Sequence, residues 1–594
     1  MAVNSYRQDE QITDTKKSIT MLRLFRYLLN YKARISAVLV LMGFCIFVSL
    51  MNPLFLQKAV DTCIAHQDVT GLLKLISTAA VLNIAMVLAV KARMYLMATV
   101  SNKVIEEIRQ ELYDHIQTLD LKFFDSRPTG KILARVIGDV NSLKDVIENS
   151  VTTMIPDLAT VICVAAIMFV KNAPLAAAAL WSLPFMIAGI FIIQKQGHRH
   201  WQQFRKKSSN LNAFINEDLS GIKIIQSFNA EKETDSIFSS LVQEHRQSFI
   251  GAVRWGDAFG SVIDLCWGLG TLALYYVGIR ILGIGNVSVG TYIAFGTYIS
   301  MFWQPIMNLS NFYNQLTTTI SGAERIFEIM DTPAEIQDDP EAPDMPAVNG
   351  TVEFDHVTFS YDKNKVILND VSFTVRQGET VALVGPTGAG KSTIVNLVSR
   401  FYDPDSGAIR IDGTDIRSVR LASLRSQMGI MTQDNYIFSG TIRENIRYGN
   451  LNASDEEIIQ AAKAVHADDF VRQLEKGYDT VLTARGGELS NGQRQLIAFA
   501  RTMLSMPRIL ILDEATSSID TQTEQQVQAG ITELLKGRTS FVIAHRLSTI
   551  QDADFIFVVD NGGIAEKGTP AELMAARGTY YNLYTAQFSM QNQR

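Results

Sequence analysis

A glycine-rich run in the C-terminal half of the chain has the residue types and spacing of a phosphate-binding loop. It reads Gly385-Pro-Thr-Gly-Ala-Gly-Lys391-Ser392 and fits the pattern GxxxxGK[ST]. Apolar residues 381–384 precede it and apolar residues at helical spacing follow it, which is the strand–loop–helix context that such a loop needs. Its backbone N–H groups and the helix N-terminus would surround an anionic phosphate chain. The residues expected to contact a nucleotide here are Gly385, Pro386, Thr387, Gly388, Ala389, Gly390, Lys391, Ser392 and Thr393.

Four side chains supply the chemistry of nucleotide hydrolysis. Lys391 would reach the outer phosphates of ATP, and the hydroxyl of Ser392 would bind Mg²⁺. Asp513 and Glu514 follow the apolar run 509–512, which has the pattern of a buried strand. A carboxylate at such a strand end suits Mg²⁺, usually through water. The adjacent Glu514 is placed to polarise the attacking water. The sequence therefore predicts an ATPase that uses Mg²⁺.

A second motif lies 24 residues before Asp513 and carries a family resemblance. Leu489-Ser490-Asn491-Gly492-Gln493 resembles the LSGGQ signature of ABC ATPases. Six apolar spans ahead of one such domain are similar to the half-transporter exporters of that family. The resemblance implies two paired chains, with each ATP between one chain's phosphate loop and the other chain's Ser490, Gly492 and Gln493.

The resemblance also implies roles for four residues outside these motifs. Tyr361 would stack on adenine, and Gln433 would sense the γ-phosphate and contribute to the Mg²⁺ site. Asp520 would communicate across the dimer, and His545 would act beside Glu514 in catalysis.

Two positions depart from the family pattern. Asn491 stands where the signature usually has glycine, and we expect little damage because asparagine tolerates left-handed backbone. Ala484 stands where many exporters have glutamate before Arg-Gly. In heterodimers of the family, the chain with the intact catalytic glutamate often carries the altered signature. The prediction therefore favours a heterodimer over a homodimer.

The N-terminal half predicts six membrane spans. Hydrophobic residues make up 47% of the chain and charged residues 19%. The expected spans are residues 35–56, 75–90, a run ending at 170, 173–193, about 259–279, and a last one between 280 and 324. The first of these has no charge over 22 residues, which is enough to cross the hydrocarbon core. Lys74, Asp157 and Asp264 interrupt the second, third and fifth spans.

Loop charges predict the orientation. Nine Lys and Arg residues lie within 91–144 and nine within 195–254, whereas the alternate loops carry almost none. The positive-inside rule places both basic segments and both termini in the cytoplasm. Each basic segment has helical periodicity, so we expect membrane helices that extend into the cytoplasm and are joined by a short turn, the first near residues 127–130.

The fold expected is an all-α six-helix transmembrane domain followed by an α/β P-loop ATPase domain of the ABC type. Residues 1–34 would form a cytoplasmic N-terminus with an interfacial helix, 35–325 the transmembrane domain, 326–349 an acidic, proline-rich linker, and 350–594 the nucleotide-binding domain. We expect a multi-pass protein of a bacterial plasma (inner) membrane.

The resulting functional prediction is ATP-driven export. The expected cargo is an amphipathic or hydrophobic drug, lipid or peptide, and the partners are a second half-transporter and membrane lipid. An ATP-gated channel or regulator is the alternative, and intact Lys391, Glu514 and His545 argue against it. Fusion of membrane and ATPase parts argues against an importer. The net charge of −6 gives no indication of a nucleic-acid partner.

Two aspartates in the predicted spans are the candidate substrate contacts. Asp157 and Asp264 fall in predicted spans, where charge is costly and marks a functional site, although both could lie at a solvated membrane edge. Aromatic residues of the last span could face a cavity or lipid; they are Tyr292, Tyr298, Phe302 and Trp303.

Overall fold

The chain divides into two compact units in the computed structural model. The structure describes residues 17–283, 286–362, 365–432, 435–513, 521–543 and 552–591. The helical unit contains Ser5–Gln117 and Thr129–Thr332, and the sheet unit contains Thr118–Pro128 and Pro333–Arg594. The short segment Thr118–Pro128 thus belongs to the sheet unit although it lies between two helices of the other unit.

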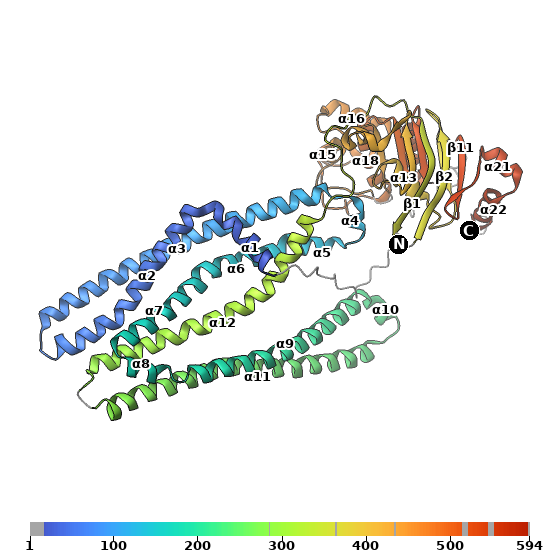
Figure 1. Ribbon diagram of the computed structural model, residues 1–594. Coiled ribbons are helices and arrows are strands. Elements are labelled where there is room, and N and C mark those ends of the chain that lie inside the picture. The colour runs from blue at the N-terminus through green and yellow to red at the C-terminus, as the bar shows by residue number, and fades with distance from the viewer. Residues whose placement is uncertain are drawn as a thin grey trace. The chain divides into compact units, whose positions relative to one another are not determined.

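Long helices, with a few short ones between them, make up the helical unit (Figure 1). They are α1 (Lys17–Leu28), α2 (Lys32–Lys58), α3 (Val69–Thr118), α5 (Thr129–Leu133), α6 (Val140–Asn149), α7 (Ile155–Lys171), α8 (Ala173–Leu180), α9 (Leu183–Ser220), α10 (Ile222–Ser227), α11 (Glu231–Tyr276) and α12 (Val289–Asp331). Short π-helical turns continue several of them, at Ala59–Ile64, Ala134–Asp139, Ser150–Met154 and Val277–Ile281.

Each predicted span lies in one of these helical stretches. Within the described residues, five stretches are long and apolar enough to cross a membrane, namely Ile19–Ile64, Val69–Thr118, Thr129–Lys171, Ala173–Ser220 and Glu231–Ile281. The sixth predicted span falls in α12, a single helix of 43 residues. Because α12 continues to Asp331, its last turns extend into the region that the sequence suggested as linker.

Aromatic side chains of α12 form the centre of the helical unit. Tyr298, Phe302 and Trp303 are almost fully buried, in one cluster with Leu50 of α2 and Leu274 of α11. The hydroxyl of Tyr298 donates to the backbone carbonyl oxygen of Leu50 at 2.9 Å. The expectation that these three aromatic residues face a cavity or lipid is therefore wrong, because α12 packs them against the neighbouring helices of its own chain.

The two basic segments are helical, as predicted, and their connections contain short helices. Helices α9 and α11 run side by side, with α10 at one end of the pair (Figure 1). Between α3 and α5 the chain forms α4 (Leu121–Asp125), whose N-terminus is capped by the side chain of Asp120. The connection expected near residues 127–130 therefore spans about ten residues, because the capped helix α4 is inserted.

Two main sheets form the sheet unit. The larger has the strand order β12-β11-β3-β10-β9-β6, parallel except for β12, and the smaller is the antiparallel sheet β2-β1-β4-β5. The strands are β1 (Val352–Asp362), β2 (Lys365–Val375), β3 (Thr380–Val384), β4 (Ser406–Ile411), β5 (Thr414–Asp415), β6 (Met428–Met431), β7 (Gly440–Thr441), β8 (Val481–Leu482), β9 (Ile509–Asp513), β10 (Thr539–Ile543), β11 (Phe555–Asp560) and β12 (Gly563–Gly568). The strands predicted at 352–354, 357–359, 381–384 and 509–512 are confirmed.

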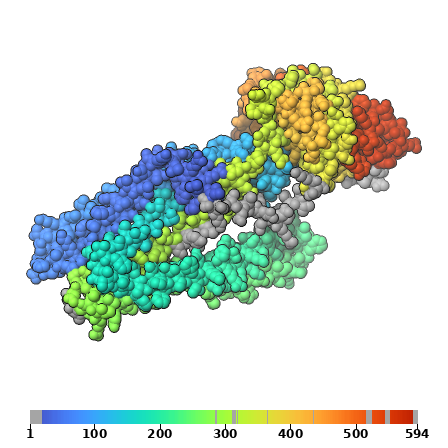
Figure 2. Space-filling model, in the orientation of Figure 1, coloured from blue at the N-terminus to red at the C-terminus, as the bar shows by residue number. Residues whose placement is uncertain are grey.

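The helices of the sheet unit pack against the sheets in two apolar cores. The helices of this unit are α4, α13 (Lys391–Val398), α14 (Leu421–Arg425), α15 (Ile442–Arg447), α16 (Asp455–Ala464), α17 (Ala467–Val471), α18 (Asn491–Leu504), α19 (Thr521–Leu535), α21 (Pro570–Ala576) and α22 (Thr579–Gln591). One apolar core joins both sheets with α13, and a second joins α15–α19 with β6, β9 and β10. In Figure 2 the red C-terminal segment lies at one end of this unit, where Leu573 and Tyr580 pack against strands β3 and β11.

Candidate functional site

The phosphate loop begins where β3 ends in the centre of the larger sheet. Gly385, Gly388 and Gly390 have φ angles of 149°, 85° and 113°, which side chains with a Cβ rarely adopt. A Cβ at Gly385 would collide with the carbonyl oxygen of Val559 on β11, and one at Gly390 would lie 2.9 Å from a methyl carbon of Leu368. These glycines therefore allow the backbone to curve closely against its neighbours.

Lys391 lies inside the curve of this loop. Its Nζ atom donates to the carbonyl oxygens of Gly385 at 2.7 Å and Pro386 at 2.9 Å, and the residue is buried. Burial lowers the pKa of this ammonium group, and the nearby Asp513 carboxylate partly opposes that shift. Helix α13 starts at Lys391, and its N-cap Gly390 provides no side-chain cap, so the first N–H groups of the helix can bind an anion.

Oxygen atoms of the kind that Mg²⁺ prefers lie at the edge of the larger sheet where the phosphate loop begins. Strands β3, β10 and β9 are parallel, so the phosphate loop after β3 and Asp513 at the end of β9 meet at their carboxyl ends. Ser392, the second residue of α13, is exposed. A hydroxyl and a carboxylate form a hard oxygen donor set that fits Mg²⁺. The residues present are therefore compatible with this ion.

Tyr361 lies near the end of β1 in a cluster of aromatic rings. Its ring centroid is 4.9 Å from that of Phe359 and 4.9 Å from that of Tyr402, and both pairs are edge-to-face. Asn396 of α13 donates its side-chain N–H to the Tyr361 hydroxyl at 3.3 Å. Because Tyr361 is 39% exposed, part of its ring remains available for stacking on a base.

Four of the residues singled out from the sequence lie outside the described residues. They are Gln433, Glu514, Asp520 and His545. Two of them follow described strands in the chain: Glu514 comes directly after Asp513 of β9, and His545 comes two residues after Ile543 of β10.

Comparisons with known proteins agree with this architecture. Residues 35–306 match the family of the ABC transporter transmembrane region, and residues 368–517 match the family described as ABC transporter. The Bacillus subtilis ABC transporter ATP-binding protein YknV is 41% identical, with 98% of this chain and 97% of that protein covered. The chain belongs to the ABC transporter family.

Further similarities identify the transport direction. The ATP-dependent lipid A-core flippase of Syntrophus aciditrophicus is 38% identical over 83% of this chain and 82% of its own length. The solved structure of a bacterial Atm1-family ABC exporter with ATP bound has a TM-score of 0.78 and 29% identity, covering 94% of this chain and 98% of that one. This protein is an ABC exporter, a multi-pass membrane protein whose ATPase domain binds ATP and couples its hydrolysis to transport.

The exporter's signature motif forms the N-terminus of α18. Ser490 caps the helix, its Oγ accepting the N–H of Gln493 at 3.2 Å, while the Gln493 side chain accepts the N–H of Ser490 at 3.0 Å. The hydroxyl of Ser490 accepts in this cap and can still donate its own proton to a ligand. Gly492, in the first turn, is buried.

The backbone of Asn491 is not left-handed, although the sequence analysis considered that conformation at this position. It is the first residue of α18 and has no positive φ, so a side chain fits here without backbone strain. Its Oδ1 atom accepts a hydrogen bond from Arg494, which also donates to the carbonyl oxygens of Gly486 and Leu489. The expectation of little damage stays a prediction, but its reason changes. The other departure, Ala484, has an exposed side chain.

No sequence motif singles out Tyr402 and Asp125. The Tyr402 hydroxyl donates to a carboxylate oxygen of Asp125, and Tyr402 is only 6% exposed. The two residues are 277 positions apart, so no local pattern links them. The sequence feature that could have indicated this contact is the run Leu121–Asp125, which contains two phenylalanines within a segment that otherwise resembles a loop.

The two intramembrane aspartates have different surroundings. Asn308 of α12 hydrogen-bonds to the Asp157 carboxylate on α7, whereas the buried Oδ2 atom of Asp157 has no partner among the described residues. Asp264 on α11 is exposed in the single chain, between half-buried and buried neighbours Val262, Ile263 and Cys266. Asp264 is therefore open to a cavity, a partner or lipid.

Proposed function

We propose that this exporter works as a dimer that moves amphipathic or hydrophobic compounds out of the cytoplasm. The observation that carries the proposal is the phosphate loop with Lys391 buried in its curve, in one domain with an N-capped signature helix. Each ATP would lie between the phosphate loop of one chain and the signature of the other.

Each residue of the site has a role in this proposal. Lys391 and the loop residues 385–393 hold the phosphates, Tyr361 stacks on adenine, and Ser490, Gly492 and Gln493 contact the γ-phosphate of the partner chain's ATP. Ser392, Asp513 and Gln433 would hold Mg²⁺, which neutralises charge on the phosphates when bound. The remaining roles follow the sequence prediction: Glu514 orients and polarises the attacking water, His545 assists it, and Asp520 communicates between the chains.

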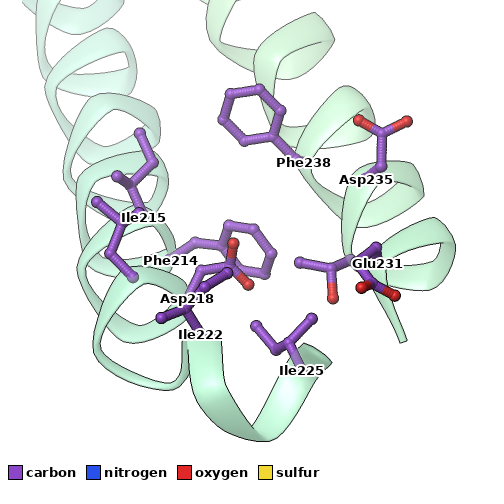
Figure 3. A pocket seen from close by; sticks show the side chains of 10 residues that line it. Phe214, Ile215, Asp218, Ile222, Ile225, Glu231, Asp235 and Phe238 are labelled. Atoms are coloured by element: carbon purple, nitrogen blue, oxygen red, sulfur yellow. The ribbon is translucent and has the colours of Figure 1, made fainter. Parts of the chain in front are cut away.

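An exposed apolar surface supports pairing of two chains. At the α10 end of the α9–α11 pair, Leu219, Ile224 and Phe228 are 66%, 65% and 80% exposed. Between the helices lies a cavity of about 360 Å³, into which Phe214 of α9 and Phe238 of α11 project, with Asp218 and Asp235 nearby (Figure 3). Apolar surface of this kind marks a site that another protein surface covers.

The partner proposed is a different half-transporter. Asn491 in the signature and Ala484 before Arg485-Gly486 are the departures that support a heterodimer. A chain that forms a stable dimer by itself, with full substrate-stimulated ATP turnover, would contradict this part of the proposal. Size and turnover of the chain expressed alone and with candidate partner chains decide between the two assemblies.

We further propose the orientation and domain limits that the sequence suggests. Both termini lie in the cytoplasm of a bacterial cell, and the protein spans the plasma membrane. The transmembrane domain covers residues 35–325, after the N-terminal segment 1–34, and the linker 326–349 leads to the nucleotide-binding domain 350–594. Nine basic residues in each of the two long segments support this orientation.

The proposed cargo class is drug, lipid or peptide, and the flippase relative supports lipids within it. The test uses the purified exporter with its partner in lipid vesicles of bacterial composition. ATP turnover is measured across a panel of lipids, cationic drugs and peptides, and each stimulating compound is then assayed for ATP-dependent movement. Stimulation without movement of any compound would contradict export and favour a gate.

A further inference from the structure

A polar hollow of about 270 Å³ lies between α3 and α6 in the helical unit. The α3 residues that line it fall at the spacing of one helix face, and the two residues from α6 are three positions apart. The facing surfaces of two helices therefore form this hollow, which is separate from the cavity between α9 and α11. Its polar lining residues are Asn102, Glu106, Arg109 and Gln110 of α3 and Asn141 and Lys144 of α6.

Two half-buried cations in this hollow have no acidic partner among the described residues. Arg109 donates from Nη2 to Oδ1 of Asn141 at 2.9 Å, but its buried Nε atom has no hydrogen-bond partner among these residues. Lys144 forms no hydrogen bond or ion pair with any of them, and Glu106 pairs with neither cation. A guanidinium group has five N–H donors, and a buried donor without an acceptor is costly. An anion with several oxygen atoms would supply acceptors to both cations.

Hydrogen bonds from the N-terminal segment determine the level of this hollow along α3. Tyr27 of α1 donates to Glu111 at 2.7 Å, and Tyr31, directly before α2, donates to Glu107 at 2.6 Å. The two tyrosines are four residues apart, and so are the two glutamates, but the order is reversed. The N-terminal segment and α3 are therefore antiparallel here, so that levels can be compared by counting from these pairs.

The hollow lies at the boundary of the hydrocarbon core. Residues 102–110 are level with residues 28–36 by this count, and the charge-free stretch of α2 begins at residue 35. Arg109 is then about 9 Å of helix beyond the start of that stretch. Lipid headgroups form a layer of roughly 5–8 Å directly outside the hydrocarbon core. Because helical side chains lean toward the N-terminus, which in α3 is the membrane-spanning end, Arg109 leans toward this layer.

We propose that the hollow between α3 and α6 binds the phosphate group of a phospholipid headgroup from the cytoplasmic leaflet. Arg109 and Lys144 would hold the phosphate oxygens, as basic pockets between membrane helices do at this level. Glu106 lies beside them, so a headgroup that also carries an ammonium group finds a partner for each charge. The choice of leaflet rests on the orientation proposed above, whereas the phosphate contact depends neither on export nor on ATP.

The test measures lipid binding to the full chain, alone or with its partner half-transporter, purified in detergent and freed of lipid. Native mass spectrometry counts bound molecules as phosphatidylethanolamine, diacylglycerol with the same acyl chains, or glycerol phosphate is added. Arg109→Gln and Lys144→Gln each remove one cation from the hollow. The matched control is Lys103→Gln, since Lys103 is an exposed lysine of α3 that does not line the hollow.

We expect Arg109→Gln and Lys144→Gln each to lower the affinity for phosphatidylethanolamine about fivefold, the effect of one cation beside a lipid phosphate. Lys103→Gln should stay within about twofold of the unaltered protein, because exposed charges contribute little. Diacylglycerol lacks the phosphate and should bind at least about tenfold more weakly, with no change in any variant. Glycerol phosphate should also bind more weakly than the lipid, because it has no acyl chains to bury.

Arg109→Gln also loses the hydrogen bond to Asn141, so the thermal unfolding of each variant is measured. If Arg109→Gln unfolds, Lys144→Gln carries the test, because its lysine has no partner among the described residues to lose.

Four results would overturn the inference. Unchanged affinity in Lys144→Gln would show that the hollow holds no phosphate, and an equal loss in Lys103→Gln would indicate general attraction to a basic surface. Diacylglycerol that binds as tightly as the phospholipid would assign binding to the acyl chains alone. Glycerol phosphate that binds as tightly would assign the site to a soluble phosphate ester. Since no ATP is present, a failure of the exporter to move any compound would contradict the proposed function and leave this result unaffected.

Discussion

The Nζ atom of Lys391 lies 2.7 Å from the carbonyl oxygen of Gly385, the first residue of the loop in which the lysine itself stands. The cation is thus held over the curve of the loop by its own backbone. Phosphate oxygens that enter this curve replace neutral carbonyl acceptors with charged ones, and a charged acceptor makes the stronger hydrogen bond.

Lys391→Ala should therefore abolish ATP turnover. The substitution removes the side-chain ammonium group that contacts the carbonyl oxygens of Gly385 and Pro386, and leaves the outer phosphates without this partner. Release of inorganic phosphate by the purified exporter measures turnover, and binding of a fluorescent ATP analogue measures occupancy. Turnover within a few-fold of the unaltered protein would refute the site.

ATP affinity should also depend on pH through Lys391. Burial lowers its pKa, and bound phosphates would raise it again because their negative charge favours the ammonium form. Affinity is then constant below the lowered pKa and falls as pH rises through it, with proton uptake on binding. ATP binding between pH 7 and 10 measures this slope. Lys391→Ala should bind weakly without the slope, and an identical slope in that variant would assign the titration to another group.

Glu514→Gln should separate binding from hydrolysis. The amide keeps the size of the side chain but cannot polarise water as a carboxylate does, so we expect turnover to fall at least several hundredfold. ATP binding and nucleotide-dependent pairing should persist. Parallel measurements of phosphate release and of ATP retained after rapid gel filtration check this. Loss of ATP binding in the variant would contradict the assigned role.

If each ATP site is formed by two chains, the rate of ATP hydrolysis should depend on which chain carries which substitution. Two copies fused in tandem are held together by the fusion whether or not this chain pairs by itself. They can carry Lys391→Ala in one copy and Ser490→Ala in the other, which leaves one complete site. The matched control places both substitutions in the same copy, so that each site has one defect. We expect the first fusion to hydrolyse ATP at least tenfold faster than the second. Equal rates would show that Ser490 does not act on the partner chain's nucleotide.

Local patterns were sufficient to predict the ATPase elements. The glycine spacing and apolar flanks of residues 381–398 determine a strand, a loop and a helix whose φ angles only glycine adopts readily. A Ser-x-x-Gln capping box at Ser490 likewise begins α18 from short-range hydrogen bonds alone. Such features depend on neighbours within a few residues, and sequence reasoning can find them.

Contacts between distant segments could not be predicted in this way. Tyr402 and Asp125 are joined only because the α3–α5 connection packs in the sheet unit. Tyr298, Phe302 and Trp303 read equally well as cavity or lipid residues, since apolar periodicity does not say which face of α12 meets the other helices. For Asn491, the sequence analysis assumed left-handed backbone at a position where the structure has ordinary helical backbone.

Asp264 gives the last prediction, on substrate selection. Its carboxylate is exposed on α11 of the single chain, beside the apolar Leu265 and Trp267, which are 62% and 43% exposed. A charge that faces lipid costs several kcal/mol, so this carboxylate should face water or a cation in the assembled exporter. Asp157 differs, because Asn308 already contacts its carboxylate. We therefore expect Asp264→Asn to reduce transport of cationic amphiphiles about tenfold, and to leave basal ATP turnover and transport of neutral compounds within about twofold.

Vesicle transport assays with a cationic compound and a neutral analogue of similar size measure the two effects. Asp157→Asn is the matched control, since it removes the same charge from another span while keeping an amide next to Asn308. It should affect cationic transport less than Asp264→Asn does. Equal loss of cationic and neutral transport in Asp264→Asn would indicate a folding role for this residue. No change in either would place its carboxylate at the solvated edge of the membrane, because only there does removal of the charge leave both the substrate path and the stability of α11 unaltered.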